Sequence, residues 1–189
     1  MKRIAIFASG SGTNAQRIAE YFNDNPVVEI TRIYCNNPHA FVLARAKKLN
    51  IPSLVFDRKS FYESESVINS LLKDQTDLIV LAGFLWLVPL NILRKFHNRI
   101  INIHPALLPE YGGKGMYGMH VHETVLNAGD KESGISIHYV NERYDEGKLI
   151  FQAKCSVDEN ETPESLAGKI HQLEYEHYPR IIEKILIEM

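Results

Sequence analysis

The sequence has few of the features that mark several large classes of protein. Two of its 189 residues are cysteines, Cys35 and Cys155, and their spacing fits neither a metal site nor a redox motif. We therefore expect two free thiols in a reducing compartment, the cytoplasm. No apolar run approaches the roughly 18 residues of a membrane span. The apolar segment 4–8 is too short for the core of a secretory signal peptide.

The net charge of the chain is also small, because basic and acidic residues nearly balance. Lysine and arginine total 21, aspartate and glutamate total 23, and the net charge is -2. This balance gives no electrostatic reason to bind nucleic acid or a membrane, and we expect neither as a partner. The hydrophobic fraction of 45% is ordinary for a globular protein. A chain of this length buries about 70% of its unfolded surface, so it can fold without disulfides or metals.

The order of apolar patterns predicts an α/β fold. In the first half, strand-like and helix-like segments alternate, which is typical of a doubly wound, mostly parallel sheet. The second half adds two strands that we expect to pair as an antiparallel hairpin. No linker is evident, so we expect a single domain over 1–189. Strands are predicted at 3–8, 28–34, 53–56, 77–82, 99–104, 134–140 and 149–157, and helices at 37–49, 60–73, 120–128 and from 162, the last broken or kinked at Pro179.

The first strand is followed by a glycine loop, Ser9-Gly10-Ser11-Gly12-Thr13-Asn14, and then by a helical pattern. Glycine allows close approach of the backbone, and the free N–H groups of a helix N-terminus favour an anion such as phosphate. The same letters loosely fit a dinucleotide fingerprint. A nicotinamide site would need an acidic residue after the second strand, where the chain has residues 35–37, Cys-Asn-Asn. A tight turn without a ligand is the remaining alternative.

Polar side chains gather where the fifth strand ends. Asn102 and His104 are two residues apart, so in an extended strand they point to the same side. This end of a strand is where open α/β sheets bind ligands. Together with His138 and Asp145, these groups could perform acid–base chemistry on a carbonyl: an amide stabilises an oxyanion, an imidazole moves a proton and a carboxylate orients it. The histidines could instead only pack or bond locally.

Three further patterns bear on the chemistry that the chain could perform. His120 and His122 could contribute to a zinc site, but i and i+2 positions at a helix start do not face each other. The serines of the glycine loop lack the spacing of a nucleophile elbow, so covalent catalysis is not supported. The apolar loop 83–89 follows a strand and is either lid packing or the wall of a site for a flat ligand.

Four motifs taken in order resemble one family. They are Ala8 to Asn14, Leu81-Ala82-Gly83-Phe84, Asn102-Ile103-His104-Pro105-Ala106-Leu107-Leu108-Pro109 and Asp145-Glu146-Gly147. This order is similar to that of the phosphoribosylglycinamide formyltransferases, folate-dependent enzymes of purine synthesis, over nearly the whole chain. The related formyltransferases that act on methionyl-tRNA, and the related deformylases, carry an extra domain that we do not expect here.

The resemblance implies a Rossmann-like formyltransferase fold and direct transfer of a formyl group from 10-formyltetrahydrofolate to the amine of glycinamide ribonucleotide, without a metal. It implies a phosphate-binding half at 1–100, a catalytic and folate-binding half at 101–189, and a monomer or homodimer. The resemblance also implies roles for single residues. The catalytic residues would be Asn102, His104 and Asp145, and the phosphate would be bound by Gly12, Thr13, Asn14 and Lys59, with Arg58 as the alternative to Lys59. The folate would be bound by Phe84, Leu85, Trp86, Leu87 and Val88 together with Asn102 and Asp145, and Ser136, His138 and Glu174 would also line the site.

Two departures from the family pattern are visible. The glycine-rich loop 111–119 is about five residues longer than the usual short turn, and residue 146 is glutamate where glycine is commoner. A binding protein that uses only the glycine loop, as a phosphate or nucleotide sensor, is the alternative from another functional class.

Overall fold

The computed structural model describes residues 1–189 and contains one seven-stranded sheet in the order β3-β2-β1-β4-β5-β6-β7. Pairs from β3 to β5 are parallel, whereas β5–β6 and β6–β7 are antiparallel. The predicted fold class is thereby confirmed. The elements are β1 (Lys2–Ala8), α1 (Thr13–Phe22), β2 (Val28–Cys35), α2 (Val42–Lys48), β3 (Ser53–Val55), α3 (Arg58–Tyr62), α4 (Ser66–Lys73), β4 (Leu78–Leu81), α5 (Leu90–Lys95), β5 (Ile100–His104), α6 (Met119–Ala128), β6 (Glu132–Tyr139), β7 (Leu149–Ser156) and α7 (Pro163–Glu188).

The sheet is covered on both faces in its parallel part. Alternate residues of β1 point to opposite faces: Ile4 and Ile6 join one apolar cluster, Ala5 and Phe7 the other. The first cluster includes residues of α1, α2 and α7, and the second includes residues of α3, α4 and α5. Because the parallel part of the sheet is covered by apolar residues on both faces, its strands are continuous hydrophobic runs in the sequence.

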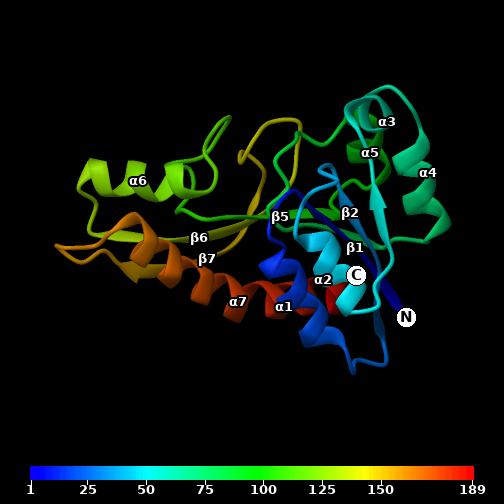
Figure 1. Cartoon of the computed structure of the whole chain (residues 1–189), viewed down its shortest axis with the longest axis horizontal. Helices are drawn as coiled ribbons and strands as arrows, with labels where there is room; N and C mark the ends of the chain where they lie inside the picture. The colour runs from blue at the N-terminus through cyan, green and yellow to red at the C-terminus, as the bar shows by residue number, and fades with distance from the viewer.

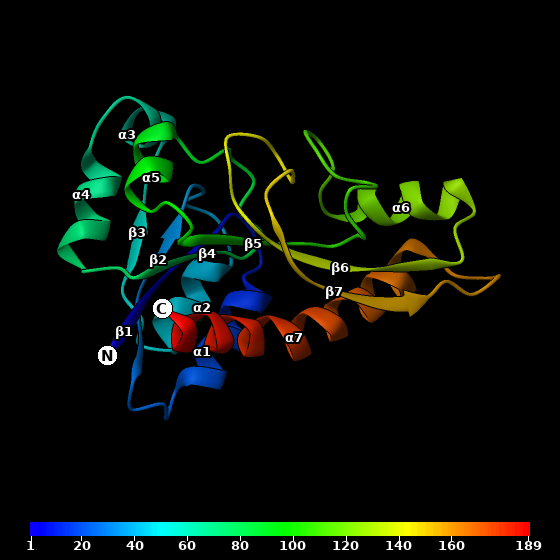
Figure 2. The ribbon, with the colours of Figure 1, turned by 180° about the vertical axis from the view of Figure 1, so that it is seen from behind.

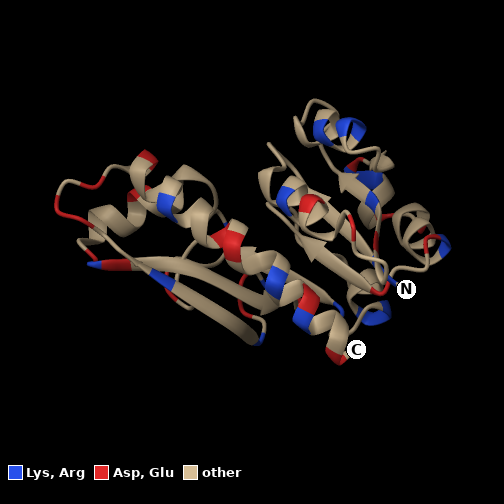
Figure 3. Ribbon diagram, turned by 90° about the horizontal axis from the view of Figure 1, so that it is seen from below, with Lys and Arg blue, Asp and Glu red and all other residues tan.

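The antiparallel strands β6 and β7 extend the sheet away from this doubly covered part (Figure 1). The long helix α7 runs back from β7 past α1, so it joins both parts of the molecule (Figure 2). Basic and acidic residues alternate along the exposed side of α7 (Figure 3). No helix combines the length and the apolar character that crossing a membrane would require.

Two helix predictions are wrong in detail. The predicted helix at 37–49 begins only at Val42, because Oδ1 of Asn37 accepts from the N–H of His39 (3.0 Å) and makes a turn. The predicted helix at 60–73 is two helices. Asp57 caps the first, accepting from the N–H of Ser60 (2.7 Å).

Of the two outcomes predicted at Pro179, a break or a kink, the break is absent, since α7 continues through Pro179 to Glu188. Proline removes one backbone hydrogen bond in a helix interior. Pro179 is nevertheless buried together with Tyr178 and Ile182, and packing of this face outweighs the local loss.

Candidate active site

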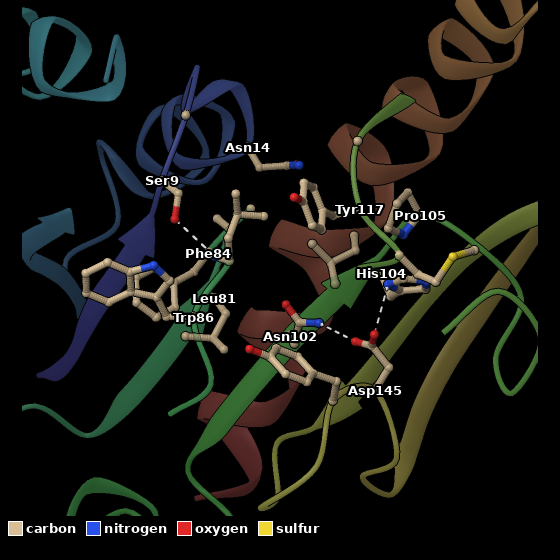
Figure 4. A pocket seen from close by; sticks show the side chains of 18 of the residues that line it. Ser9, Asn14, Leu81, Phe84, Trp86, Asn102, His104, Pro105, Tyr117 and Asp145 are labelled. Atoms are coloured by element: carbon tan, nitrogen blue, oxygen red, sulfur yellow. Dashed lines mark hydrogen bonds and ion pairs between the residues drawn. The ribbon is translucent and has the colours of Figure 1, made fainter. Parts of the chain in front are cut away.

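A cavity of about 600 Å³ opens at the carboxyl ends of β1, β4 and β5. The chain order reverses here, because β2 lies on one side of β1 and β4 on the other. Such a switch point is where doubly wound sheets bind ligands. The loops after β1, β4, β5 and β6 all contribute to the lining, and Figure 4 shows side chains from these segments facing one another.

Sheet register brings the first polar pair together. Asn102 on β5 lies directly opposite His138 on β6, and its Nδ2 is 3.1 Å from Nε2 of His138. A carbonyl oxygen can only accept and an amide nitrogen can only donate, so Nδ1 of His138, 2.9 Å from the Tyr139 oxygen, carries a hydrogen. Nε2 of His138 therefore accepts from Asn102. The other amide hydrogen makes a longer contact, 3.4 Å, with Oδ1 of Asp145.

His104 is held by the loop that follows it. Its Nε2 lies 2.7 Å from the carbonyl oxygen of Tyr111, so this nitrogen carries the hydrogen. The other ring nitrogen, Nδ1, faces Oδ2 of Asp145 at 3.6 Å. Burial lowers the pKa of His104 below its ordinary value, although Asp145 and the Tyr111 carbonyl act in the opposite direction. His104 is thus predominantly neutral at pH 7, with Nδ1 as its basic atom.

Asp145 is the centre of the group. Burial alone would raise the pKa of its carboxyl, but His138, His104 and the N–H of Gly113 together hold that pKa below its ordinary value. The Gly113 N–H donates to Oδ2 at 3.0 Å, so the long loop after β5 binds directly to this carboxylate. Asp145 remains an anion, to which the N–H of Gly113 and, at longer range, Nδ2 of Asn102 donate.

The backbone around Asp145 explains its unusual position. Its φ of 57° lies in the left-handed region, which aspartate tolerates better than most residues. Gly147 follows in close contact with the sheet, because a Cβ there would lie 1.6 Å from the Tyr139 oxygen. The glycine is therefore required for the loop to return against β6 and to present Asp145 to the cavity.

The glycine loop forms the opposite end of the cavity. Gly12 has a φ of 75°, and a Cβ on it would lie 2.3 Å from Cγ2 of Val42. The helix α1 begins directly after it without a side-chain cap. The first N–H groups of a helix have no partners within the helix, so those of Thr13 and Asn14 remain available to an anion.

A buried acid adjoins this loop. Glu174 on α7 is 6% exposed and accepts a 2.9 Å hydrogen bond from Nδ2 of Asn14. Burial raises the pKa of Glu174 to about 7, with the Asn14 hydrogen bond opposing the shift. Oδ1 of Asn14 is buried and has no hydrogen-bond partner in the chain. Both polar groups line the cavity, which suits a ligand with hydroxyl or amine hydrogens.

The apolar loop 84–88 forms a third side. All five residues line the cavity, although they differ in burial: Phe84 and Val88 belong to the second apolar cluster, whereas Leu85 is exposed. The guanidinium of Arg58 lies 4.9 Å from the centre of the Trp86 ring. This segment therefore packs on the core and also lines the cavity, and its binding of a flat ligand stays a prediction.

Two residues predicted for the site lie elsewhere. Ser136 donates to the Ala106 oxygen (2.6 Å) and accepts from the Leu108 N–H (2.9 Å), so it holds the turn after β5 and does not line the cavity. Its burial is complete. Lys59 is an exposed residue of α3 outside the lining, whereas the neighbouring Arg58 reaches Trp86.

Other lining residues are not among those that the resemblance implies for the site. The segment 113–118 borders the cavity, and Tyr117 lies between Asn14 and Pro105 in Figure 4. His122 and His171 also line it, whereas His120 is exposed and pairs loosely with Glu123. No three histidine, cysteine or acidic side chains are grouped as metal ligands.

Comparison with known proteins agrees with this geometry. Residues 2–182 match the family model described as formyl transferase. A phosphoribosylglycinamide formyltransferase of Bacillus subtilis is 36% identical over 191 residues, which cover 98% of the chain and 95% of the relative. A chloroplastic one from Arabidopsis thaliana is 37% identical over 193 residues, 99% of the chain but 66% of that relative. The crystal structure of phosphoribosylglycinamide formyltransferase from Bacillus halodurans has a TM-score of 0.88 at 38% identity, covering 98% of the chain and 95% of the other.

Proposed function

The chain belongs to the formyl transferase family, and we propose that it transfers the formyl group of 10-formyltetrahydrofolate to the amine of glycinamide ribonucleotide. One observation carries the proposal: Asn102, His104 and Asp145 converge in the same cavity as a backbone loop suited to phosphate. A phosphate sensor would need the loop alone. A formyl transfer needs both ends, with the amine of one substrate placed against the carbonyl of the other.

The cavity fits two small substrates. Its volume of about 600 Å³ lies within the range of small-molecule sites, and it combines an apolar wall with a few polar groups. The phosphate of the nucleotide would bind at residues 12–14, with Asn14 and Glu174 beside the ribose and amine. The flat ring of the folate would lie against residues 84–88. The folate would then contact both halves of the domain, because residues 84–88 belong to the half 1–100 and the proposed catalytic residues belong to the half 101–189.

Asn102 is proposed as the donor to the developing oxyanion. One of its amide hydrogens is fixed by His138 at 3.1 Å, which sets the plane of the amide. The other has only the 3.4 Å contact with Asp145, so it is available to a stronger acceptor placed within its reach. When the amine attacks the formyl carbon, the carbonyl oxygen becomes such an acceptor.

His104 is proposed to take a proton from the attacking amine at Nδ1. Nε2 is committed to the Tyr111 carbonyl, so Nδ1 is the ring atom with a free lone pair. The protonated ring would then face the Asp145 carboxylate, 3.6 Å away, and would be stabilised by it. Collapse of the tetrahedral adduct returns the proton to the leaving nitrogen of the folate. The step needs neither a covalent enzyme intermediate nor a metal.

A single assay tests the proposal. The purified chain is mixed with glycinamide ribonucleotide and 10-formyltetrahydrofolate, and formyl transfer is followed with and without a chelator. We expect transfer at the same rate in both samples. Absence of transfer, with phosphate binding retained, would favour a sensor. Transfer that the chelator abolishes would overturn the metal-free mechanism.

A further inference from the structure

The glycine loop is held from behind by helix α2. The N–H of Val42, the first residue of that helix, donates to the Gly10 oxygen at 3.1 Å. One turn later, Nε of Arg45 donates to the Ser11 oxygen at 2.9 Å. Two successive carbonyl groups of the loop are therefore satisfied on the side away from the ligand.

This contact fixes the direction of a peptide group. The C=O and N–H of one trans peptide unit point in opposite directions. Because the Ser11 oxygen is turned towards Arg45, the Gly12 N–H of the same unit is turned away from it. Gly12 lies in the cavity lining, so this N–H is directed to the side where an anion would bind.

The surroundings of Arg45 leave its charge unneutralised. Its Nη1 donates to the side-chain oxygen of Gln16, and its guanidinium carbon lies 5.0 Å from the centre of the Phe41 ring. Together with the Ser11 carbonyl, these contacts are all to uncharged groups. Gln16 belongs to the first turn of α1, where its N–H donates to the Gly12 oxygen at 2.9 Å. One cation thus joins the loop, α1 and α2.

We propose that Arg45 is a positioning residue for the phosphate of the nucleotide substrate: it aims the Gly12 N–H at the phosphate and adds positive potential behind the loop. This inference rests on the proposed function for the identity of the phosphate carrier. Its contact with the loop is through Nε, an atom that lysine lacks, so lysine can supply the charge without the orientation.

The test compares substrates with and without the phosphate. Steady-state formyl transfer is measured for the wild type and for Arg45→Met, with glycinamide ribonucleotide and with its dephosphorylated riboside. We expect Arg45→Met to raise KM for the ribonucleotide about ten-fold, as loss of an oriented charge-assisted contact does, with kcat within about two-fold. For the riboside, kcat/KM should be unchanged.

Two further variants separate the phosphate effect from general damage. Lys48→Met removes the same charge from the exposed side of α2 and should leave every constant unchanged. Arg45→Lys should give a KM for the ribonucleotide between those of the wild type and Arg45→Met. Thermal unfolding shows whether each variant is folded, and if Arg45→Met is not, the comparison is made with Arg45→Lys. Equal losses on both substrates, or an unchanged KM for the ribonucleotide, would overturn the inference.

Direct binding of inorganic phosphate, followed by calorimetry, keeps the inference separate from the proposed function. Weaker phosphate binding by Arg45→Met than by Lys48→Met supports the role of Arg45 even if no formyl transfer occurs. Equal phosphate binding by the two variants contradicts it even if the wild type is an active transferase.

Discussion

The two ends of the cavity differ in the kind of group that lines them: backbone groups at one end and side chains at the other. At the end proposed to bind phosphate, the available groups belong mainly to the backbone of residues 10–14, which helix α2 holds through Val42 and Arg45. At the end proposed to be reactive, the groups are side chains from three segments: Asn102 and His104 on β5, His138 on β6 and Asp145 on the following loop.

This difference separates binding from reactivity. A backbone site is fixed by local geometry and is damaged when a side chain intrudes on it. A side-chain site is lost when one polar group is removed, while the fold around it is retained. Substitutions at the phosphate end should therefore act mainly on KM, and substitutions at the reactive end mainly on kcat.

The largest effect is expected at Asn102. Removal of an oxyanion donor typically costs about 10²–10³ in turnover, so Asn102→Ala should lower kcat by that factor. The measurement is steady-state transfer at saturating concentrations of both substrates, with thermal unfolding to show that the variant is folded. Asn127→Ala, which removes an exposed amide from α6, is the control. Near-normal turnover of Asn102→Ala would remove Asn102 from the mechanism.

A smaller effect, mainly on substrate binding, is expected for Gly12→Ala. The left-handed conformation costs a residue with a side chain roughly 1–2 kcal/mol, and the new Cβ would clash with Val42. We expect KM for the ribonucleotide to rise by about ten-fold or more, with a smaller fall in kcat and a lower melting temperature.

The control is Gly168→Ala on α7, where a Cβ meets no atom within 4 Å and no positive φ is required. This variant should keep its KM and gain stability, since alanine favours a helix more than glycine does. If Gly12→Ala lowered kcat alone, the division between a binding end and a reactive end would be wrong.

The same difference explains what the sequence could predict. The glycine loop and the pair Asn102 and His104 are local patterns, so their chemistry was visible before the fold was known. Asp145 was a candidate from its residue type, and the family resemblance, confirmed by the match over residues 2–182, placed it beside His104. Composition and spacing alone could not, because residues 104 and 145 meet only through the pairing of β5 with β6.

Other parts of the site had no local signal. Tyr111 and Gly113 contribute a backbone oxygen and a backbone N–H, which any residue type could supply. Ser136 shares a strand face with His138, but it lies opposite His104 in the register and is used to bind the turn after β5. Lys59 is an exposed residue of α3 outside the cavity lining, and no local pattern distinguished it from Arg58.

The smallest effect is expected from a group that acts on His104 at a distance. Tyr111 has a φ of 56°, and its hydroxyl donates to Oδ2 of Asp130 at 2.5 Å, which anchors the residue whose carbonyl accepts from His104. The hydrogen bond from His104 to the Tyr111 carbonyl raises the pKa of His104, in opposition to the larger effect of burial, which lowers it. Tyr111→Phe should loosen the anchor and lower the pKa of His104 further.

The pH profile of kcat/KM measures this shift. His104 must be neutral to accept a proton, so activity is lost as the pH falls through its pKa, which burial holds below the ordinary value in the wild type. In Tyr111→Phe, this acid limb should move to lower pH, and kcat should fall by only about two- to five-fold, as expected for a weakened hydrogen bond. Tyr21→Phe, which removes an exposed hydroxyl bonded to Glu183, should change neither. An acid limb that stayed in place, or moved to higher pH, would show that the Tyr111 carbonyl does not set the protonation of His104.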